Sequence, residues 1–338
     1  MSTPTVDSEF SFELLVCRWA ELGWHPTAAS SDGADGAPVI VSRQLGTQRR
    51  RWDTIVIECD PAGLAARREF GDRAIDGELL PIVRHAPAEW AYYRDALPDP
   101  GYPWRYVREA IHRAAARGLV EKRKNGNRIE IRRKRPYPDW VRRIVAVENK
   151  PDLDASAAAA LSDQLEHDVE TALADEVWLA TGRTGDRVEP ALLRQFPVEA
   201  GVLTFDFAGP GVDADAATVD WLPSELDAAA PSERFDAAEK ARRRRLIAER
   251  AYGKGWRSIT ETMRPDCRWF EVARAGRGIV PVCGAKGRCQ TESECSSRCG
   301  SFEPEPPQWR TKGWPIDGGP GQGVRELLER RRERARRR

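Results

Sequence analysis

The chain has 338 residues, of which 41% are hydrophobic, enough to fill the cores of two or three globular domains. Its 54 Lys and Arg nearly balance its 53 Asp and Glu, but residues 325–338 hold 8 Arg and 3 Glu, which leaves a net −4 for the rest. A basic tail on a slightly acidic body suggests a phosphate-rich partner, although such tails are often only solvated helix ends. No stretch approaches about 18 uncharged apolar residues and residues 1–12 lack a signal pattern, so we expect a cytoplasmic protein without a membrane segment.

The first part of the chain predicts one helix followed by two strands. Residues 8–24 have apolar side chains at helical spacing. Residues 38–45 and 52–59 are two strand patterns joined by a basic turn, as in a β-hairpin. Asp53 stands at the start of the second strand, directly before its apolar run.

Residues 61–137 differ in character from their surroundings, because three helical patterns are followed by a basic two-stranded ribbon around an Asn-Gly-Asn turn. This arrangement predicts a winged-helix-like insertion that contacts nucleic acid, although a charged hairpin is more often only a solvated edge. The helices are expected at 61–70, 87–97 and 104–117, and the strands at 119–123 and 128–132. The residues expected to bind nucleic acid are Arg105, Arg108, Lys122, Arg123, Lys124 and Arg128.

A short apolar strand, Ile144 to Val147, ends on a carboxylate and an amine. In a strand, Glu148 and Lys150 point to one face and Asn149 points to the other. A carboxylate and an ammonium group at the end of a buried strand suit a divalent cation and a phosphate. The plainer alternative is a surface ion pair, because Glu-x-Lys is a weak pattern on its own.

The segment after this strand predicts further helices and strands. Asp154 can cap a helix over 154–175, on which Gln164 and Asp168 lie four residues apart and can face the preceding strand end. Residues 209–232 are rich in Asp, Ala and Pro and are expected to form a loop. The order of elements predicts an α/β domain with a mixed sheet flanked by helices. The remaining elements are expected as strands at 176–181 and 201–207, a short helix at 189–196 and a basic helix at 235–252.

Five of the seven cysteines fall between Cys267 and Cys299, in a segment too poor in aliphatic residues to form a core of its own. In a chain without secretory features, metal ligation is favoured over disulfides, and Zn²⁺ and a [4Fe–4S] cluster are the two candidates. The spacings leave the identity of the metal undecided. Five cysteines are available for four ligand positions, and Cys289, in the loop between Cys283 and Cys295, is expected to be the one that does not bind. The expected ligands are Cys267, Cys283, Cys295 and Cys299.

Asp53 before one strand, Glu148 and Lys150 at the end of another, and a following helix with Gln164 resemble the PD-(D/E)xK nuclease superfamily, which has the restriction-endonuclease-like fold. Nearly the whole chain further resembles an uncharacterised family of this type from halophilic archaea, although its net charge of +1 is unlike the acidity expected of proteins from high-salt cytoplasm. The segments that carry this second resemblance are residues 147–153, 238–242 and 248–257.

The resemblance implies an α-β-β-β-α-β core in which Asp53 and Glu148 bind Mg²⁺ or Mn²⁺, while Lys150 helps to activate water and to stabilise the developing phosphate charge. It also implies that Gln164 matches a glutamine of some members. Glu13 corresponds to a first-helix carboxylate of others, whereas its helix pattern alone places it in solvent.

Two features bear on how far this resemblance extends. Asp53 and Glu148 are 95 positions apart, so residues 61–137 must be inserted between two core strands with their ends close together. Iron–sulfur members of the superfamily join one cysteine before the core to three after it, and Cys17 is the corresponding residue. Because Cys17 falls on the apolar side of its helix, a self-contained C-terminal cluster is the preferred hypothesis.

We therefore expect a metal-dependent nuclease that hydrolyses DNA, with a catalytically inactive nucleic-acid-binding protein of the same fold as the alternative. A third hypothesis is a structural interaction module in which Glu148 and Lys150 form only an ion pair. The complete set of Asp53, Glu148 and Lys150 favours the first, because a binding protein is expected to lose at least one. The expected domains are a nuclease-like core at 1–60 and 138–210, the winged-helix-like insertion at 61–137, a linker and basic helix at 211–258, a Cys-rich metal-binding module at 259–310 and a basic tail at 311–338.

Overall fold

The fold is built on one mixed six-stranded sheet with helices on both faces, which confirms the α/β class that the sequence predicted. The structure is a computed structural model, and the part of the chain that it describes comprises residues 9–24, 37–47, 50–182, 188, 190–207, 212–256, 267, 269–275, 278–288 and 299–301.

The central sheet consists of β1 (Val39–Gly46), β2 (Arg51–Cys59), β6 (Val141–Lys150), β7 (Glu176–Gly182), β8 (Gly201–Phe205) and β9 (Ala217–Trp221). They lie in the order β1-β2-β6-β7-β8-β9. The β1–β2 and β2–β6 pairs are antiparallel, the β6–β7 and β7–β8 pairs are parallel, and β9 closes the edge antiparallel to β8. Each parallel pair requires a crossover connection, and a helix supplies the first of them.

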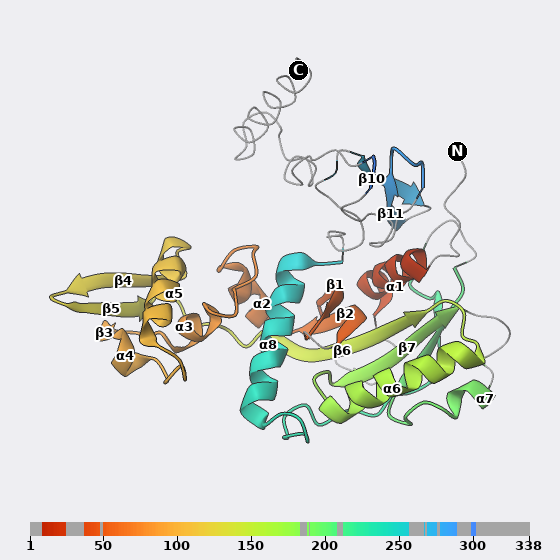
Figure 1. Ribbon diagram of the computed structural model, residues 1–338, viewed down its shortest axis with the longest axis horizontal. Coiled ribbons are helices and arrows are strands. Elements are labelled where there is room, and N and C mark those ends of the chain that lie inside the picture. Colours follow the sequence, from red (N-terminus) through yellow and green to blue (C-terminus); the bar gives the residue numbers. More distant parts are fainter. Residues whose placement is uncertain are drawn as a thin grey trace, which may run out of the picture.

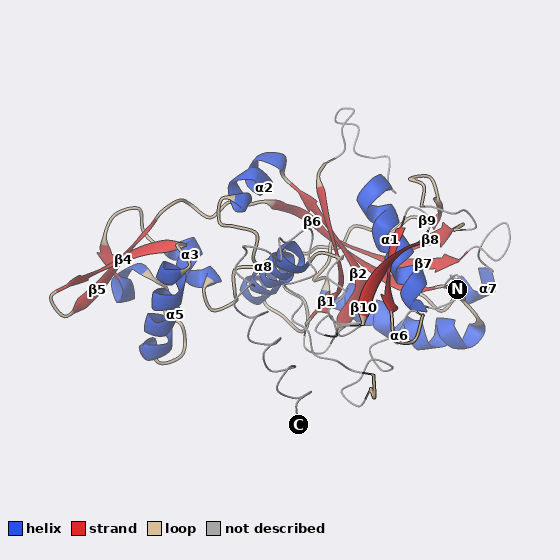
Figure 2. Ribbon diagram, turned by 90° about the horizontal axis from the view of Figure 1, so that it is seen from above, coloured by secondary structure: helices blue, strands red, loops and turns tan. Residues whose placement is uncertain are grey.

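Helix α1 (Glu9–Gly23) covers one face of the sheet, and α6 (Ala155–Thr171) and α8 (Ala237–Lys254) cover the other (Figure 1 and Figure 2). The alternation of side chains along β6 shows this, because Val145 and Val147 pack with α1, whereas Ile144 and Ala146 pack with α8. A strand covered on both faces needs an apolar run, which is why β6 is so readily recognised in the sequence. The short α7 (Pro190–Leu193) lies between β7 and β8 along the chain.

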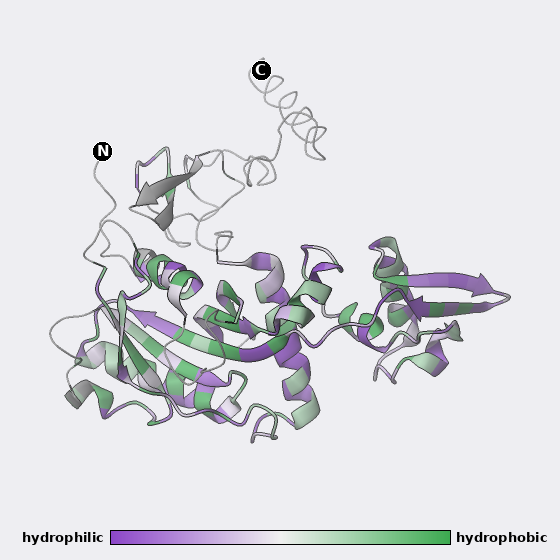
Figure 3. Ribbon diagram, turned by 180° about the vertical axis from the view of Figure 1, so that it is seen from behind, coloured by the Kyte–Doolittle hydropathy of each residue, from purple (hydrophilic) through white to green (hydrophobic). Residues whose placement is uncertain are grey.

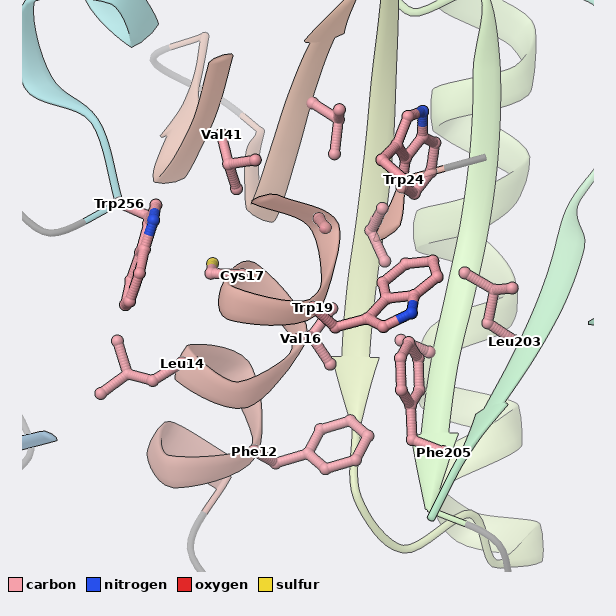
Figure 4. Close-up of a cluster of buried hydrophobic side chains, with 14 of the residues drawn as sticks. Phe12, Leu14, Val16, Cys17, Trp19, Trp24, Val41, Leu203, Phe205 and Trp256 are labelled. Atoms are coloured by element: carbon pink, nitrogen blue, oxygen red, sulfur yellow. The ribbon is translucent and has the colours of Figure 1, made fainter. Parts of the chain in front are cut away.

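The core beneath α1 is rich in aromatic side chains, as Figure 4 shows. Trp19 packs edge to face against Phe205 and Trp24, with ring centroids 5.0 Å and 5.6 Å apart. Such aromatic pairs contribute roughly 0.5–1.5 kcal/mol beyond the burial of their area. Helix α1 is therefore fixed against the sheet, and the side chains at its sheet-facing side have defined positions.

The insertion leaves the core after β2 and returns before β6, with its two ends side by side. The N–H of Asp60 donates to the carbonyl of Trp140 at 2.9 Å. Gly63 lies so close to the returning chain that a Cβ there would approach the carbonyl oxygen of Asp139 to 2.5 Å. This closeness is what the resemblance requires of so long an insertion. Its elements are α2 (Pro61–Arg68), α3 (Leu80–His85), β3 (Ala91–Tyr92), α4 (Tyr93–Ala96), α5 (Trp104–Ala116), β4 (Val120–Asn125) and β5 (Arg128–Arg133).

Elements α3 to β5 form a unit that projects from the core (Figure 1 and Figure 2). Its three strands lie in the order β3-β5-β4. Val107 and Ile111 of α5 and Ile131 of β5 are buried in a hydrophobic cluster separate from those of the central sheet. The ribbon of β4 and β5 beyond this cluster is largely hydrophilic, as Figure 3 shows. The insertion thus has its own small core and an exposed basic hairpin.

Two sequence predictions are corrected by the structure. Residues 87–97 do not form one helix, because β3 pairs with β5 and only α4 is helical. Pairing that extends the small sheet outweighs a local helical spacing. Residues 209–232 are not entirely a loop, because β9 within them pairs with β8. The aspartates and alanines at 213–216, directly before β9, conceal the strand from a pattern-based prediction.

Helix α8 belongs to the core, although the sequence analysis placed it in a separate linker segment. Ile247, Ala248 and Ala251 lie in the same buried cluster as Ile55 and Ile144 of the central strands. The arginines of α8 suggested a solvated basic helix, but its other side is apolar and covers the sheet. The core that starts at α1 therefore extends through the end of α8.

A buried ion pair fastens α2 to α8. Arg67 donates to Glu249 from Nε at 2.7 Å and from Nη2 at 2.6 Å, and both side chains are buried. Glu249 also accepts hydrogen bonds from the Tyr137 hydroxyl at 2.5 Å and the Ile75 N–H at 2.7 Å. The Arg67 guanidinium lies 4.1 Å from the centre of the Tyr252 ring. This network satisfies both carboxylate oxygens.

The described C-terminal part contains an antiparallel hairpin of β10 (Phe270–Ala275) and β11 (Gly278–Cys283), which lies near α1 (Figure 1). Among the described residues, no helix is long and apolar enough to cross a membrane.

Candidate functional site

Asp53 and Glu148 lie beside each other on neighbouring antiparallel strands. Thr54 pairs with Val147, so the next position along brings Asp53 of β2 opposite Glu148 of β6. Opposite residues of an antiparallel pair point to the same face, and Lys150 shares this face because it follows Glu148 by two positions. The three residues predicted to act together are thus placed at one end of the central strands.

Asp53 is held from two sides. Its Oδ2 accepts a hydrogen bond from the Asn149 N–H at 3.0 Å, and its Oδ1 accepts one from the Gln44 amide at 2.9 Å. The same Gln44 amide donates to Glu13 at 3.1 Å. Gln44 has a φ of 52°, in the left-handed region. A non-glycine residue pays on the order of 1–3 kcal/mol for such strain, and strained residues cluster at functional sites.

Glu13 is buried, which corrects the expectation that it faces solvent. Arg43 of β1 donates to its carboxylate at 2.5 Å, and burial raises the pKa of Glu13 to about 7, with a further rise from Asp53 and an opposing effect of Arg43. The helix pattern failed because a partner on β1 allows this carboxylate to point toward the sheet. A first-helix carboxylate therefore lies next to Asp53.

The Asn149 side chain points to the opposite face, as the strand pattern predicted. Its Nδ2 donates to the Thr54 hydroxyl at 2.8 Å, and that hydroxyl is 3.3 Å from the sulfur of Cys17. Burial raises the pKa of the Cys17 thiol to about 12. Figure 4 shows Cys17 in the aromatic cluster, together with Val41 and Trp256. This neutral, buried thiol is a packing residue in the arrangement described.

A cavity of about 430 Å³ opens over these groups, and Asp53, Glu148, Lys150 and Gln164 all line it. The Lys150 ammonium lies 3.0 Å from a carboxylate oxygen of Glu9, and the two side chains are 33% and 62% exposed. An ion pair this exposed is worth about 0–1 kcal/mol. The Lys150 ammonium can therefore turn to an anionic ligand at little cost.

Arg50 joins Glu148 to Asp168. Its Nη2 donates to Glu148 at 2.5 Å and to Asp168 at 2.7 Å, and its Nε lies 3.1 Å from both oxygens of Asp168. The carboxylate side chains of Glu148 and Asp168 are only 6% and 1% exposed. The sequence placed Asp168 near the strand end, but no signal in the turn before β2 showed that Arg50 reaches a helix 118 positions away.

The carboxylates of this site have raised pKa values. Burial is the main cause of the rise in the pKa of Glu148, followed by repulsion from Asp53, while Arg50 opposes it. Burial likewise raises the pKa of Asp53 and of Asp168, against the hydrogen bonds that each accepts. One guanidinium thus binds two of these three buried carboxyl groups, so the site holds a surplus of carboxylates.

The donor set fits a hard divalent cation. Mg²⁺ and Mn²⁺ prefer oxygen ligands, and two adjacent carboxylates whose ionised forms are disfavoured gain most from a bound cation. Within the described part of the chain, no group of three or more His, Cys, Asp or Glu is arranged as a metal site. The fit therefore rests on the pair formed by Asp53 and Glu148.

The cysteine candidates are only partly within the described residues. Cys267 and Cys283 are buried, Cys299 is half-buried, and all three are free thiols. Cys295, predicted as a ligand, and Cys289, predicted as the spare thiol, lie outside the described residues. Metal binding by these cysteines therefore stays a prediction.

The basic surface of the insertion combines charge with aromatic rings. Residues 104–135 contain twelve Lys and Arg against three Glu. The guanidinium of Arg123 lies 4.5 Å from the Trp90 ring centre, and that of Arg128 lies 5.2 Å from the Tyr92 ring centre. The six residues predicted to bind nucleic acid are all exposed: Arg105, Arg108, Lys122, Arg123, Lys124 and Arg128.

The fold and the site define an α/β protein with a buried carboxylate pair at the end of its central strands. Residues 40–304 match a family of unknown function, DUF5787, and because the match covers most of the chain, the protein belongs to this family. No curated protein and no solved structure matches the chain. The matched range contains Asp53, Glu148 and Lys150 but not α1, which supplies Glu9 and Glu13.

Proposed function

We propose that this protein is a metal-dependent nuclease that hydrolyses phosphodiester bonds of DNA, with a PD-(D/E)xK core. The observation that carries the proposal is the convergence of Asp53, Glu148, Lys150 and Gln164 on one cavity, from two strands and a helix. A surface ion pair between Glu148 and Lys150 does not explain this convergence, because Lys150 pairs with Glu9 and Glu148 pairs with Arg50.

Each residue has a role that follows from its position. Asp53 and Glu148 hold Mg²⁺ or Mn²⁺, which supplies polarisation of the phosphate and a lowered pKa of water when it is bound. The Asn149 N–H and the Gln44 amide orient Asp53 by hydrogen bonds. Lys150 leaves its exposed partner Glu9 and places positive charge beside the scissile phosphate.

The insertion supports a nucleic acid as the substrate. Helices followed by a basic two-stranded ribbon support a winged-helix-like insertion, and such units dock on DNA. An excess of positive charge supplies most of the affinity for a phosphate backbone. The half-buried rings of Trp90 and Tyr92 beside it suit stacking on bases. Lys122, Lys124 and Arg128 would contact phosphates in this proposal.

The second candidate is a catalytically inactive nucleic-acid-binding protein of the same fold. The observation that favours it is the short contact between Arg50 and Glu148, since an arginine occupies one oxygen of a proposed metal ligand. The two candidates share the basic insertion and differ only in whether the cavity over β2 and β6 performs chemistry.

Cleavage assays with Mg²⁺ or Mn²⁺ on single- and double-stranded DNA separate the two. Glu148→Ala and Lys150→Ala should abolish cleavage, and Glu166→Ala, an exposed carboxylate on the same helix as Gln164, should leave it unchanged. Equal activity in wild type, Glu148→Ala and Lys150→Ala would remove the nuclease assignment. Salt-sensitive DNA binding without cleavage would favour the inactive binding protein.

We also propose that Cys267, Cys283, Cys295 and Cys299 bind Zn²⁺ or a [4Fe–4S] cluster. Four thiolates around a metal would hold a segment that is poor in aliphatic residues. The burial of Cys267 and Cys283 is compatible with ligation. Elemental analysis tests the proposal, and a brown protein with visible absorbance would select iron–sulfur over zinc.

A further inference from the structure

The Arg50 side chain is held in one position by hydrogen bonds from its guanidinium group. Its Nε and Nη2 bind Asp168, its Nη2 also binds Glu148, and its Nη1 donates to the carbonyl of Arg51 at 2.8 Å. All three guanidinium nitrogens therefore have partners, and their directions differ. A planar guanidinium held in this way has one orientation.

Hydrogen bonds between Thr47 and Arg50 fix the backbone from which this side chain extends. The N–H of Thr47 donates to the Arg50 carbonyl at 2.7 Å, and the Arg50 N–H donates to the Thr47 hydroxyl at 3.1 Å. A Cβ on Gly46 would lie 2.3 Å from the Arg50 carbonyl oxygen, so only glycine permits this close approach. The backbone at Arg50 is thus fixed as firmly as its guanidinium.

The two oxygens of Glu148 are used unequally. Oε1 accepts from Arg50 at 2.5 Å, and among the described residues no group donates a hydrogen bond to Oε2. The charges of Asp53 and Asp168 both raise the pKa of Glu148. Glu148 therefore holds the guanidinium through Oε1, lies beside Asp53 on the neighbouring strand, and has one oxygen still available.

We propose that Arg50 is a built-in second cation, which fills the position between Glu148 and Asp168 and restricts the site to a single divalent ion held by Asp53 and Glu148. This inference rests on the proposed nuclease function. Nucleases and phosphatases with two metal ions hold them about 3.5–4 Å apart through shared carboxylates. Here the carboxylates for two positions are present, and a guanidinium takes one of them.

Arg50 is then a positioning residue. It orients Glu148 by binding Oε1 and leaves Oε2 for the ion that Asp53 and Glu148 would hold. It also neutralises Asp168, so that this buried carboxylate does not attract an ion of its own. The Arg50 side chain supplies the positive charge that a second metal ion would otherwise bring.

The test is the number of Mn²⁺ ions bound, measured by titration calorimetry and electron paramagnetic resonance without any substrate. Wild type should bind one isolated ion. Arg50→Gln keeps an amide that can donate to Asp168 but removes the charge, and it should bind two ions with a spin-coupled spectrum. Adding Asp168→Asn to this variant should return the number to one, because the second position then lacks a carboxylate.

Arg50→Lys is the matched control, because it retains the positive charge beside Asp168 and should still bind one ion. Two ions in wild type overturn the inference without any variant, and so does a single ion in folded Arg50→Gln. Those results leave the proposed nuclease function intact. Wild type that binds no Mn²⁺ overturns both, and the two failures are therefore distinguishable.

Discussion

The molecule contains two buried arginine–carboxylate networks, and they differ in how completely their charges are matched. In the first, Arg67 faces the single carboxylate of Glu249, whose oxygens also accept from Tyr137 and Ile75. In the second, Arg50 faces Glu148 and Asp168, with Asp53 beside them. The Arg67–Glu249 pair of the first network is closed to solvent, and the second network borders a cavity of about 430 Å³.

The difference separates buried charge that stabilises the structure from buried charge that, in the proposed nuclease, would bind a metal ion. The Arg67–Glu249 pair, with one positive and one negative charge, fixes the insertion to α8 and needs no further cation to balance its charge. A surplus of carboxylates is held in place at a cost in stability, and a cation can offset that cost. The raised pKa values of Glu148, Asp53 and Asp168 are the signature of the second kind of network.

The largest expected effect is on the closed network. Arg67→Ala leaves Glu249 buried without its cation and should lower the free energy of unfolding by about 3–5 kcal/mol. Arg68→Ala, an exposed arginine on the same helix, should change it by less than about 0.5 kcal/mol. Urea denaturation measures both, and similar small losses in the two variants would show that the closed network has no special structural role.

The site should make the protein less stable as the pH rises. Because the pKa of Glu13 is raised from 4.5 to about 7 in the folded protein, its protonation favours folding fully below pH 4.5, and that contribution is lost as the pH rises toward 7. One such group changes the free energy of unfolding by at most about 1.4 kcal/mol per pH unit in this window. Urea titrations across the window should show a smaller slope for Glu13→Gln, and an unchanged slope would contradict this.

Removing a surplus carboxylate should stabilise the fold. Glu148→Gln eliminates a charge that burial and Asp53 disfavour, so the free energy of unfolding at pH 7 should rise while cleavage is lost. Glu249→Gln is the matched change in the closed network and should destabilise. Thermal melting of the two variants compares them directly, and shifts of the same sign would break the distinction between the networks.

The smallest effects are expected on the basic insertion. Lys124→Ala should weaken DNA binding about equally for all sequences and reduce the slope of log affinity against log salt by about 1. Arg194→Ala, an exposed arginine of the core segment, should leave that slope unchanged. Fluorescence anisotropy at several salt concentrations measures it, and equal slopes for wild type and Lys124→Ala would exclude a phosphate contact at Lys124.

Much of the core could be predicted from the sequence, because buried strands need apolar runs and such runs are visible. The apolar run before Glu148 and the run after Asp53 located β6 and β2, whereas only the family resemblance implied that the two strands lie together in the core. The insertion hairpin was predicted for a similar reason, because its Asn-Gly-Asn turn requires a positive φ at Gly126.

The features that the sequence did not predict depend on contacts between segments that are distant along the chain. Arg50 lies in a basic turn that resembles any solvated turn, and its role follows only from the position of α6. Glu13 differs from a solvent-facing helix residue only through Arg43 on β1. The short β3 exists because β5 offers it hydrogen bonds, and a local pattern has no access to that pairing.

The most direct test of the central claim is anomalous X-ray diffraction from crystals of wild type soaked in Mn²⁺. The claim is that the surplus carboxylates at the ends of β2 and β6 form a cation site. It predicts a single anomalous peak bounded by the carboxylates of Asp53 and Glu148, with Arg50 still bound to Asp168. No peak at this position in Mn²⁺-saturated crystals would contradict the account.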